Sequence, residues 1–421
     1  MKQIQMQDIK NRKSGLNVDD SIEKKVIVIV KEVKKKGDKA LLEYTKKFDN
    51  VKLKAEDLLV QNEEIKKAEE SITEEVKQAL DIAKENIIQY QSTFIQKSHE
   101  NLFNQGVILK NIVKPFDKVG VYIPGGTAPL VSTVLMTVLP AKVAGVEEVI
   151  ATVPPQKDGS INPNILYACK LCGVDKIYKV GGAQAIAALA YGTETIPKVN
   201  KIVGPGNIYV SLAKKCVFGN VDIDMIAGPS ELLVVADESV NPEWTARDLM
   251  SQAEHDIMSE VILVCFSKQY ADKVIEIFES KMQDMQRAEI IKKSWKEKAK
   301  YFIAKNIEEV IEAVNLIAPE HLELMAQDSE KIADKIKNAG AIFLGNYTPE
   351  AIGDYVAGPS HVLPTGGSAS CFSVLKADDF YKHISLISYD KEAFEKQSKH
   401  AGVLAELEGL TAHLASLEVR R

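Results

Sequence analysis

Short runs of β-branched and aliphatic residues alternate with helix-like segments along most of this chain. Five such runs, each followed by glycine, proline or aspartate turns, fall at 118–124, 148–154, 175–182, 200–206 and 231–237. A strand, a turn, a helix and a further strand form the repeating unit of a parallel sheet. Two later runs, at 260–266 and 340–346, predict a second unit of the same kind. The sequence therefore predicts an α/β protein.

Helix-like segments surround these strands. Residues 21–48 have Ser and Asp caps, dense charges and a break at Gly37, so we expect helices on both sides of that glycine. Residues 56–95 predict a second helical stretch, and 269–315 predict more. The apolar stretch 128–146 is interrupted by proline and lysine, which favours a buried helix over a membrane span.

Composition excludes several classes of protein. The chain has 421 residues, of which 45% are hydrophobic and 27% charged, as in a globular protein of two or three domains. A net charge of −6 offers no basic field for nucleic acid, and residues 1–15 lack the apolar core of a signal peptide. Cys169 and Cys172 form one C-x-x-C, which we interpret as small apolar residues on a helix face. We expect a cytoplasmic protein with reduced thiols and no membrane partner.

Glycine-rich turns follow three of the expected strands. They are YIPGG at 122–126, VGGAQ at 180–184 and VGPGN at 203–207. In open α/β sheets ligands bind beyond the carboxyl ends of the strands, and glycine lets the backbone approach a ligand closely. None of the turns has the G-x-G-x-x-G spacing of the standard dinucleotide fingerprint. A nucleotide site and plain tight turns therefore both explain these glycines.

Four of the seven histidines lie in short segments that also hold a carboxylate or an amide. The pairs are Gln252 with His255, Glu320 with His321, Asp354 with His361, and Glu408 with His413. Imidazole nitrogen and carboxylate oxygen together suit zinc, although any one such pair is more often structural. The segment 251–260 is expected to be helical, which would place its pair on one helix face. The remaining histidines, in charged contexts typical of a surface, are His99, His383 and His400.

The segment APEHLEL at 318–324 indicates a general base. Pro319 suits the first turn of a helix, where the helix dipole disfavours a charged imidazole. A neutral His321 beside Glu320 is suited to accept a proton. We therefore expect a helix that begins near Pro319. A plain helix start also explains Glu320, but it does not explain the adjacent histidine.

In their order along the chain, these segments resemble histidinol dehydrogenases. The resemblance covers nearly the whole chain and rests on GVYIPGGTAPLVSTVLM (120–136), VGGAQAIAALAYGT (180–193), VGPGNIYV (203–210), DIDMIAGPSELLVVAD (222–237), SQAEHD (251–256), APEHLEL (318–324), GDYVAGPSHVLPTGG (353–367) and EGLTAH (408–413). One departure is Ser360, because the family pattern leads us to expect asparagine before the histidine.

The resemblance implies two incomplete Rossmann-like domains with parallel sheets, plus small N- and C-terminal extensions. The implied boundaries are 1–20 for the N-terminal extension, 21–122 with 231–375 for the first domain, 123–230 for a second, NAD-associated domain, and 376–421 for a C-terminal extension that reaches the partner in a homodimer. It also implies a zinc-dependent, NAD-linked, four-electron oxidation of L-histidinol to L-histidine through L-histidinal, the last step of histidine biosynthesis.

The same resemblance implies a role for each candidate residue. The zinc ligands would be Gln252, His255, Asp354 and, from the other subunit, His413. Glu320 and His321 would be the catalytic proton-transfer pair. The substrate would contact Ser230, His361 and Glu408, together with the four zinc ligands and His321. The NAD contacts would be Tyr122, Gln184 and Asn207.

Two other functions stay open on the residues alone. A zinc hydrolase without NAD would use histidine and carboxylates in the same way. A non-enzymatic metal-binding or amino-acid-binding protein is the second alternative, and it leaves the Glu320–His321 pair without a use. Formation of NADH from histidinol and NAD separates the dehydrogenase from both.

Overall fold

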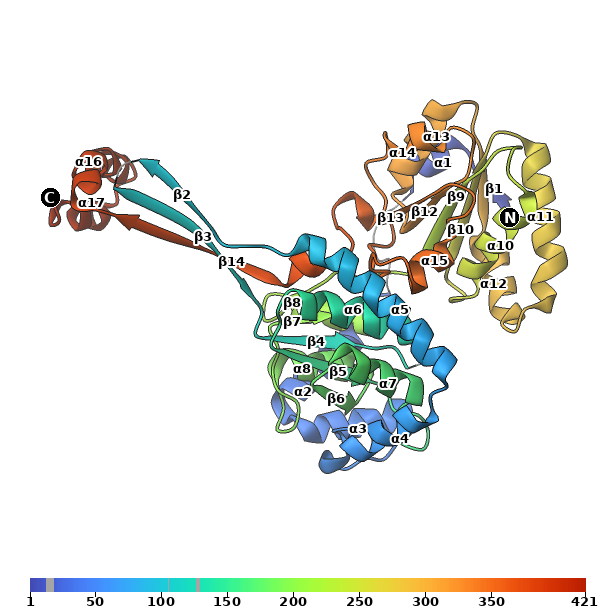
Figure 1. Ribbon diagram of the computed structural model, residues 1–421, viewed down its shortest axis with the longest axis horizontal. Coiled ribbons are helices and arrows are strands. Elements are labelled where there is room, and N and C mark those ends of the chain that lie inside the picture. Colours follow the sequence, from blue (N-terminus) through green and yellow to red (C-terminus); the bar gives the residue numbers. More distant parts are fainter. Residues whose placement is uncertain (13–18, 105, 126–128) are drawn as a thin grey trace.

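The computed structural model describes residues 1–12, 19–104, 106–125 and 129–421, with only the backbone described for 100–104. The chain forms two lobes and a long arm (Figure 1). A parallel sheet lies at the centre of each lobe, and a three-stranded antiparallel sheet forms the arm. The predicted α/β class is therefore confirmed. No helix in the described part of the chain is long and apolar enough to span a membrane.

The first lobe is built on a six-stranded sheet of order β1-β11-β10-β9-β12-β13 in which every pair is parallel. Its strands are β1 (Lys2–Gln3), β9 (Glu231–Val235), β10 (Glu260–Cys265), β11 (Lys300–Ile303), β12 (His321–Leu324) and β13 (Ala341–Leu344). Its helices are α1 (Met6–Lys10), α10 (Pro242–Ala253), α11 (Lys268–Lys281), α12 (Ala288–Lys298), α13 (Ile307–Ile317), α14 (Ser329–Ala333) and α15 (Glu350–Tyr355).

Side-chain alternation divides the first lobe into two cores. Leu232 and Val234 of β9 pack in a core with α10, α11 and α12, whereas Leu233 and Val235 pack in a core with α1, α13 and α14. All five residues of β9 are buried, as expected for a parallel strand covered on both faces.

The second lobe is built on a five-stranded parallel sheet of order β6-β5-β4-β7-β8. Its strands are β4 (Lys118–Tyr122), β5 (Glu148–Val153), β6 (Lys176–Lys179), β7 (Lys201–Val203) and β8 (Asp222–Ile223). One core contains α4 (Asn62–Ser71), α5 (Glu74–Gln91), α6 (Val131–Val143) and α7 (Pro163–Cys172). The other contains α2 (Asp20–Lys36), α3 (Asp38–Asp49), α8 (Gly182–Tyr191) and α9 (Ile208–Val217).

The packing differs from the implied domain boundaries. Helices α2 to α5 pack against α6 to α9 of the second lobe, although residues 21–122 were expected to join 231–375. At the N-terminus, β1 pairs with β11 and is therefore an edge strand of the first lobe. A division into two domains stays a proposal, with α2 to β8 in one unit and β9 to α15, together with β1 and α1, in the other.

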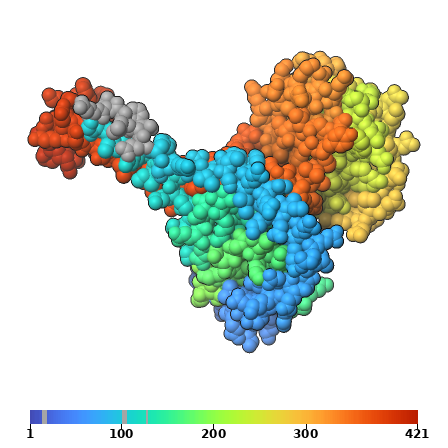
Figure 2. All heavy atoms as spheres, in the orientation of Figure 1, coloured from blue at the N-terminus to red at the C-terminus, as the bar shows by residue number. Residues whose placement is uncertain are grey.

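The arm carries the C-terminal part of the chain away from both lobes (Figures 1 and 2). Its strands are β2 (His99–Asn104), β3 (Val107–Pro115) and β14 (Tyr381–Tyr389), in the order β14-β3-β2. Two helices, α16 (Lys391–Leu407) and α17 (Thr411–Glu418), lie at its tip. Short 3-10 helices elsewhere are η1 (Ala55–Asp57), η2 (Ser92–Phe94), η3 (Met282–Asp284), η4 (Ser368–Ser370) and η5 (Ala377–Phe380).

Most of the predicted elements are confirmed. All seven predicted strands are present as β4, β5, β6, β7, β9, β10 and β13. Gly37 separates α2 from α3, and α6 forms the predicted buried helix within the described part of 128–146. Cys169 and Cys172 are buried in α7, as interpreted. Gly126, Thr127 and Ala128, which belong to the quoted motifs, lie outside the described residues.

Three local predictions are wrong. The helix expected near Pro319 is the strand β12, because α13 ends at Ile317 and Ala318 adopts a left-handed conformation with φ 49°. The strand β11 interrupts the stretch 269–315 that was expected to be helical. In the segment 251–260, α10 ends at Ala253, so His255 lies in the turn after the helix instead of on its face.

Candidate active site

Three histidines lie close enough at the amino end of β12 for their charges to affect one another. His321 is the first residue of that strand, His255 follows α10, and His361 follows α15. Burial, followed by the charges of His255 and His361, lowers the pKa of His321 to about 3. The histidine cluster therefore lies at the amino end of the first sheet, whereas the glycine-rich turns lie at the carboxyl ends of strands in the second.

His321 is held in one orientation by the backbone. Its side chain is buried, and Nδ1 donates a hydrogen bond of 3.1 Å to the carbonyl oxygen of Glu231. Because a carbonyl oxygen can only accept, the proton of the neutral ring lies on Nδ1. Nε2 has no hydrogen-bond partner among the described residues. The ring is therefore a neutral base whose lone pair is available at Nε2.

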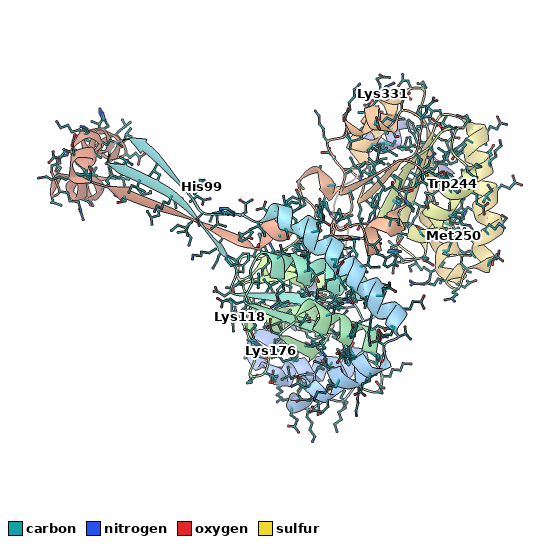
Figure 3. All side chains as sticks on the ribbon, in the orientation of Figure 1. His99, Lys118, Lys176, Trp244, Met250 and Lys331 are labelled. Carbon is teal, nitrogen blue, oxygen red and sulfur yellow. The ribbon has the colours of Figure 1, made fainter. Side chains whose placement is uncertain are left out.

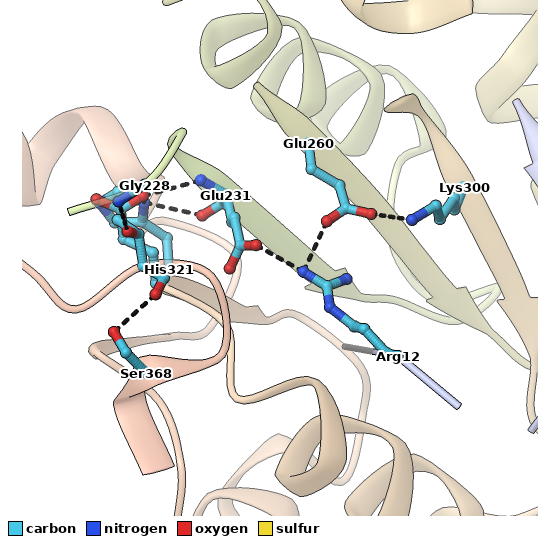
Figure 4. Close-up of polar contacts among 9 residues, drawn as sticks. Arg12, Gly228, Glu231, Glu260, Lys300, His321 and Ser368 are labelled. Atoms are coloured by element: carbon cyan, nitrogen blue, oxygen red, sulfur yellow. Dashed lines mark hydrogen bonds and ion pairs between the residues drawn. The ribbon is translucent and has the colours of Figure 1, made fainter. Parts of the chain in front are cut away.

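Glu231 is fixed in turn by a chain of ion pairs (Figure 4). Arg12 Nη2 lies 2.6 Å from Glu231 Oε1 and 2.7 Å from Glu260 Oε2. Lys300 pairs with the other oxygen of Glu260. These contacts join the starts of β9, β10 and β11, and they hold the carbonyl that orients His321.

Three carboxyl groups, two of them buried and that of Asp354 partly buried, surround the imidazole of His321. Glu320 Oε2 and Glu350 Oε1 lie 3.8 and 3.7 Å from Nδ1, and Asp354 Oδ1 lies 3.9 Å from Nε2. Burial raises the pKa of Glu320 and Glu350 well above the usual range and that of Asp354 to about 7. None of the three forms an ion pair with lysine or arginine in the described part of the chain. Such a cluster would be stabilised by a bound cation.

A metal ion fits this cluster. Ligand atoms of His255, Glu350 and Asp354 lie within 4.8 Å of one another. Gln252, in the last turn of α10, is fully buried, and neither atom of its side-chain amide has a hydrogen-bond partner among the described residues. One oxygen of Glu350 is equally unpaired. One nitrogen and several oxygens form a donor set that suits zinc.

Two of the candidate residues lie far from this cluster within one chain. Glu408 ends α16 and His413 lies on α17, so both are at the tip of the arm (Figure 1). Both side chains are exposed. The three histidines expected on the surface are exposed as well, and Figure 3 shows His99 on the arm. The structure therefore leaves Glu408 and His413 apart from the other site residues of the same chain.

The other candidate substrate contacts of the same chain, Ser230 and His361, come from segments next to the cluster. Ser230 directly precedes β9 and is half-buried. His361 Nε2 lies 3.1 Å from Ser132 Oγ on α6, so it links the first lobe to the second. Burial lowers the pKa of His361 to about 4, and its ring is therefore neutral near pH 7.

The glycine-rich turns meet around Tyr122 at the carboxyl ends of β4, β6 and β7. The buried hydroxyl of Tyr122 accepts a hydrogen bond of 3.1 Å from the backbone N–H of Gly182. A Cβ on Gly204 would lie 2.2 Å from the carbonyl oxygen of Tyr122, so only glycine fits there. Gln184 is buried, and its side-chain amide has no partner among the described residues. Asn207 accepts from two backbone N–H groups at the start of α9.

A buried ion pair that the sequence analysis missed fixes this last turn. Lys214 and Asp224 have side chains only 2% and 0% exposed, and they pair with each other. Lys214 Nζ donates to the carbonyl oxygen of Gly204 at 3.0 Å, and Asp224 Oδ2 accepts from the N–H of Gly204 at 2.8 Å. The pair therefore holds both backbone groups of the glycine that lies against Tyr122.

Comparison with known proteins identifies the family. The family model described as histidinol dehydrogenase matches residues 12–421. This chain belongs to the histidinol dehydrogenase family. The histidinol dehydrogenase of Clostridium acetobutylicum is 50% identical over 414 residues, which are 98% of this chain and 95% of that protein. The histidinol dehydrogenase of Aquifex aeolicus is 49% identical, over 97% of this chain and 95% of that protein.

A solved structure supports the same assignment. The crystal structure of histidinol dehydrogenase from Elizabethkingia anophelis matches with a TM-score of 0.92 and 38% identity, and the match covers 100% of this chain and 97% of that one. The predicted resemblance to histidinol dehydrogenases is therefore confirmed, and with it the prediction that the chain is an oxidoreductase.

Ser360, the departure from the expected histidinol dehydrogenase pattern, has a structural role. Its buried hydroxyl donates a hydrogen bond of 3.0 Å to the carbonyl oxygen of Met136 in α6. In a helix that carbonyl would accept from the N–H of residue 140, but Pro140 has none. Ser360 thus supplies the donor that Pro140 lacks, and it anchors the segment before His361 to the second lobe.

Three carboxyl groups of this histidinol dehydrogenase site were missed. Glu350 was not singled out, although it lies four residues before Asp354 on α15. Glu323 accepts from the N–H of Glu350 at 2.7 Å, and burial followed by the charge of Asp248 raises the pKa of Glu323 well above its usual range. The strand period of two puts Glu323 on the same face as His321. Because residues 318–324 were expected to form a helix, this strand spacing of His321 and Glu323 was overlooked.

Proposed function

We propose that this chain oxidises L-histidinol to L-histidine through L-histidinal, with zinc as its resident metal and NAD as the hydride acceptor. Membership of the histidinol dehydrogenase family supports the substrate and the reaction. The observation at the site that most directly supports the proposal is a neutral His321 whose Nε2 is unpaired. It lies beside buried or partly buried carboxyl groups that lack a basic partner. Such an arrangement suits removal of a proton next to a bound cation.

Four side chains would hold the zinc ion: Gln252, His255, Asp354 and His413 of the partner subunit. The unpaired amide of Gln252 and the proximity of His255 to Asp354 support the first three. Zinc, when bound, supplies a fixed positive charge that orients the substrate and takes no part in electron transfer.

His321 and Glu320 would each accept a proton in one of the two oxidation steps. In the first step, His321 Nε2 accepts the hydroxyl proton while the carbinol carbon gives a hydride to NAD, which yields the aldehyde and NADH. In the second step, Glu320 accepts a proton from water as the water adds to the aldehyde carbon. The resulting hydrate anion would give a second hydride to a second NAD, which yields the carboxylic acid and a second NADH, and the acid would then lose its proton to solvent to leave the carboxylate. The raised pKa of Glu320 keeps this carboxyl able to hold a proton.

NAD would bind where the three glycine-rich turns meet, in contact with Tyr122, Gln184 and Asn207. Their position beyond the carboxyl ends of the strands supports this assignment, since ligands of open α/β sheets bind there. The unpaired buried amide of Gln184 is a further observation in favour of a polar ligand.

A homodimer would complete each site. The arm exposes large aliphatic side chains, including Ile384, Ile387, Val403 and Leu407, of which Leu407 is 82% exposed. A second copy of the chain would cover this apolar surface and bring Glu408 and His413 to the site of its partner, where the substrate would also contact Ser230 and His361. The cysteines are all free, which supports the proposed cytoplasmic location.

The direct test follows NADH absorbance after L-histidinol and NAD are mixed with the purified protein. The proposal predicts two NADH for each histidinol consumed, with histidine as the product. Release of one NADH with the aldehyde as the final product would contradict the four-electron reaction. Absence of any NADH from zinc-loaded protein would contradict the proposed function as a whole.

A further inference from the structure

Glu350 has no structural explanation among the contacts that surround it. It is the first residue of α15, it is 2% exposed, and its Oε2 has no hydrogen-bond partner among the described residues. Its Oε1 lies 3.7 Å from His321 Nδ1, which already donates to the carbonyl oxygen of Glu231. Burial of a carboxyl group without a donor or a basic partner is unfavourable unless something else occupies its oxygens.

The neighbouring buried carboxyl groups differ from Glu350 in this respect. Glu320 Oε2 accepts from the N–H of Glu231 at 2.8 Å. Glu323 Oε1 accepts from the N–H of Glu350 at 2.7 Å. Both groups therefore have a backbone donor, whereas the carboxyl of Glu350 has none among the described residues.

The position of Glu350 suits a metal ligand. Its ligand atom lies within 4.8 Å of those of His255 and Asp354. Glu350 and Asp354 are four residues apart on α15, a spacing that puts both carboxyl groups on one helix face. Together with the unpaired amide of Gln252, one chain offers a nitrogen and three oxygens, which is enough for four-coordinate zinc.

We propose that Glu350 is a metal ligand, and that it lets one chain hold the ion through Gln252, His255, Glu350 and Asp354 before His413 of the partner subunit reaches the site. The inference rests on the proposed function in one respect, namely that this cluster is the metal centre. It adds a ligand to the set implied by the family resemblance, and it makes metal loading independent of the arm of the second copy.

The test measures zinc binding in a His413→Ala background, which removes the ligand from the arm but leaves the cluster intact. Zinc affinity is determined by competition with a chromophoric chelator after the metal has been removed. We expect the His413→Ala protein to bind one zinc per chain. Adding Glu350→Gln should lower the affinity by more than the roughly 10–100-fold that changes to outer-shell partners cost. Adding Glu320→Gln, the matched change of a neighbouring buried carboxyl that is not proposed as a ligand, should lower the affinity by no more than this outer-shell range of roughly 10–100-fold.

Two results would overturn the inference. One is a His413→Ala protein that binds no zinc, and the other is a Glu350→Gln change that weakens binding no more than Glu320→Gln. If Glu350→Gln does not fold, a crystal structure of zinc-loaded His413→Ala protein decides the matter by anomalous scattering. We expect a Glu350 oxygen about 2.0–2.2 Å from the ion, and an ion held without that oxygen would refute the inference.

The proposed function can fail separately. A protein with the unchanged sequence that binds zinc and oxidises histidinol, but whose zinc affinity in the His413→Ala background is insensitive to Glu350→Gln, refutes only the role of Glu350. A zinc-loaded protein that forms no NADH from histidinol refutes the proposed function, whatever Glu350 does for the metal.

Discussion

His321 donates through Nδ1 to the carbonyl oxygen of Glu231, at 3.1 Å, and this one bond leaves its Nε2 as the available base. The backbone of Glu231 also donates to Glu320 Oε2, at 2.8 Å. One residue therefore orients both members of the proposed proton-transfer pair. Because Glu231 itself pairs with Arg12, the orientation depends on contacts among three strands of the first sheet.

Replacing each member of the pair should affect a different step. His321→Gln removes the base for the hydroxyl proton, so we expect oxidation of histidinol to fall by about 10²–10⁴-fold while oxidation of added histidinal falls much less. Glu320→Gln should have the opposite preference. Rates of NADH formation from the alcohol and from the aldehyde are compared for both variants. Equal losses of rate on both steps in both variants would show that the two residues do not act in separate steps.

Breaking the buried Lys214–Asp224 pair should destabilise the second lobe. Lys214→Met leaves the carboxyl of Asp224 buried without its partner, which costs roughly 3–5 kcal/mol of the free energy of unfolding. The control is Lys176→Met, in which Lys176 (labelled in Figure 3) loses a partly exposed pair with Glu148. Solvent-exposed pairs contribute only about 0–1 kcal/mol. Urea unfolding of both variants measures the difference. Similar losses of unfolding free energy for the two variants would mean that the buried pair contributes no more to stability than the more exposed one.

Ser360 should be replaceable by asparagine but not by alanine. Ser360→Ala leaves the carbonyl oxygen of Met136 without a donor, at a cost of about 1–3 kcal/mol for an unsatisfied buried group. Ser360→Asn keeps a donor at this position, so it should cost less. Thermal unfolding of the two variants tests this order, and a more stable alanine variant would contradict the explanation that involves Pro140.

Stability should depend on pH through His361. An unfolded histidine has a pKa near 6.5, whereas burial lowers the pKa of His361 to about 4. Between these values the unfolded chain binds a proton that the folded chain does not, so this residue makes the protein less stable as pH falls from about 6.5 to about 4. In metal-free protein, His361→Gln should lose less stability over that window. The urea midpoint at several pH values measures it, and parallel pH profiles would contradict this contribution.

Seven strands of the two parallel sheets could be predicted from the chain, because buried parallel strands are continuous apolar runs between turns. The order of the strands within each sheet was not predicted. The arm could not be predicted in the same way. His383 of β14 pairs with Val113 of β3, and no local signal marks a partner so distant in the sequence. Pro319, which suits the first turn of a helix, misled the interpretation of 321–324, where a short strand begins four residues after the end of α13.

The residues of the candidate site could likewise be predicted only in part from the sequence. Sequence spacing paired four of the seven histidines with a nearby carboxylate or amide. In the structure three of these, His255, His321 and His361, lie near one another although they come from three separate segments. Glu350 was missed because no histidine lies near it in sequence. Its role became visible only from its unpaired oxygen and its distance to neighbouring ligand atoms.

The central claim is that two chains build each site, with His321 from one and His413 from the other. Mixing two inactive variants, His321→Gln and His413→Ala, after unfolding and joint refolding tests this claim directly. Each mixed dimer would contain one site with both residues intact, so NADH formation from histidinol should reappear in the mixture although neither variant alone is active. A mixture of exchanged chains that stays inactive would show that both residues serve the site of their own chain, and would contradict the account.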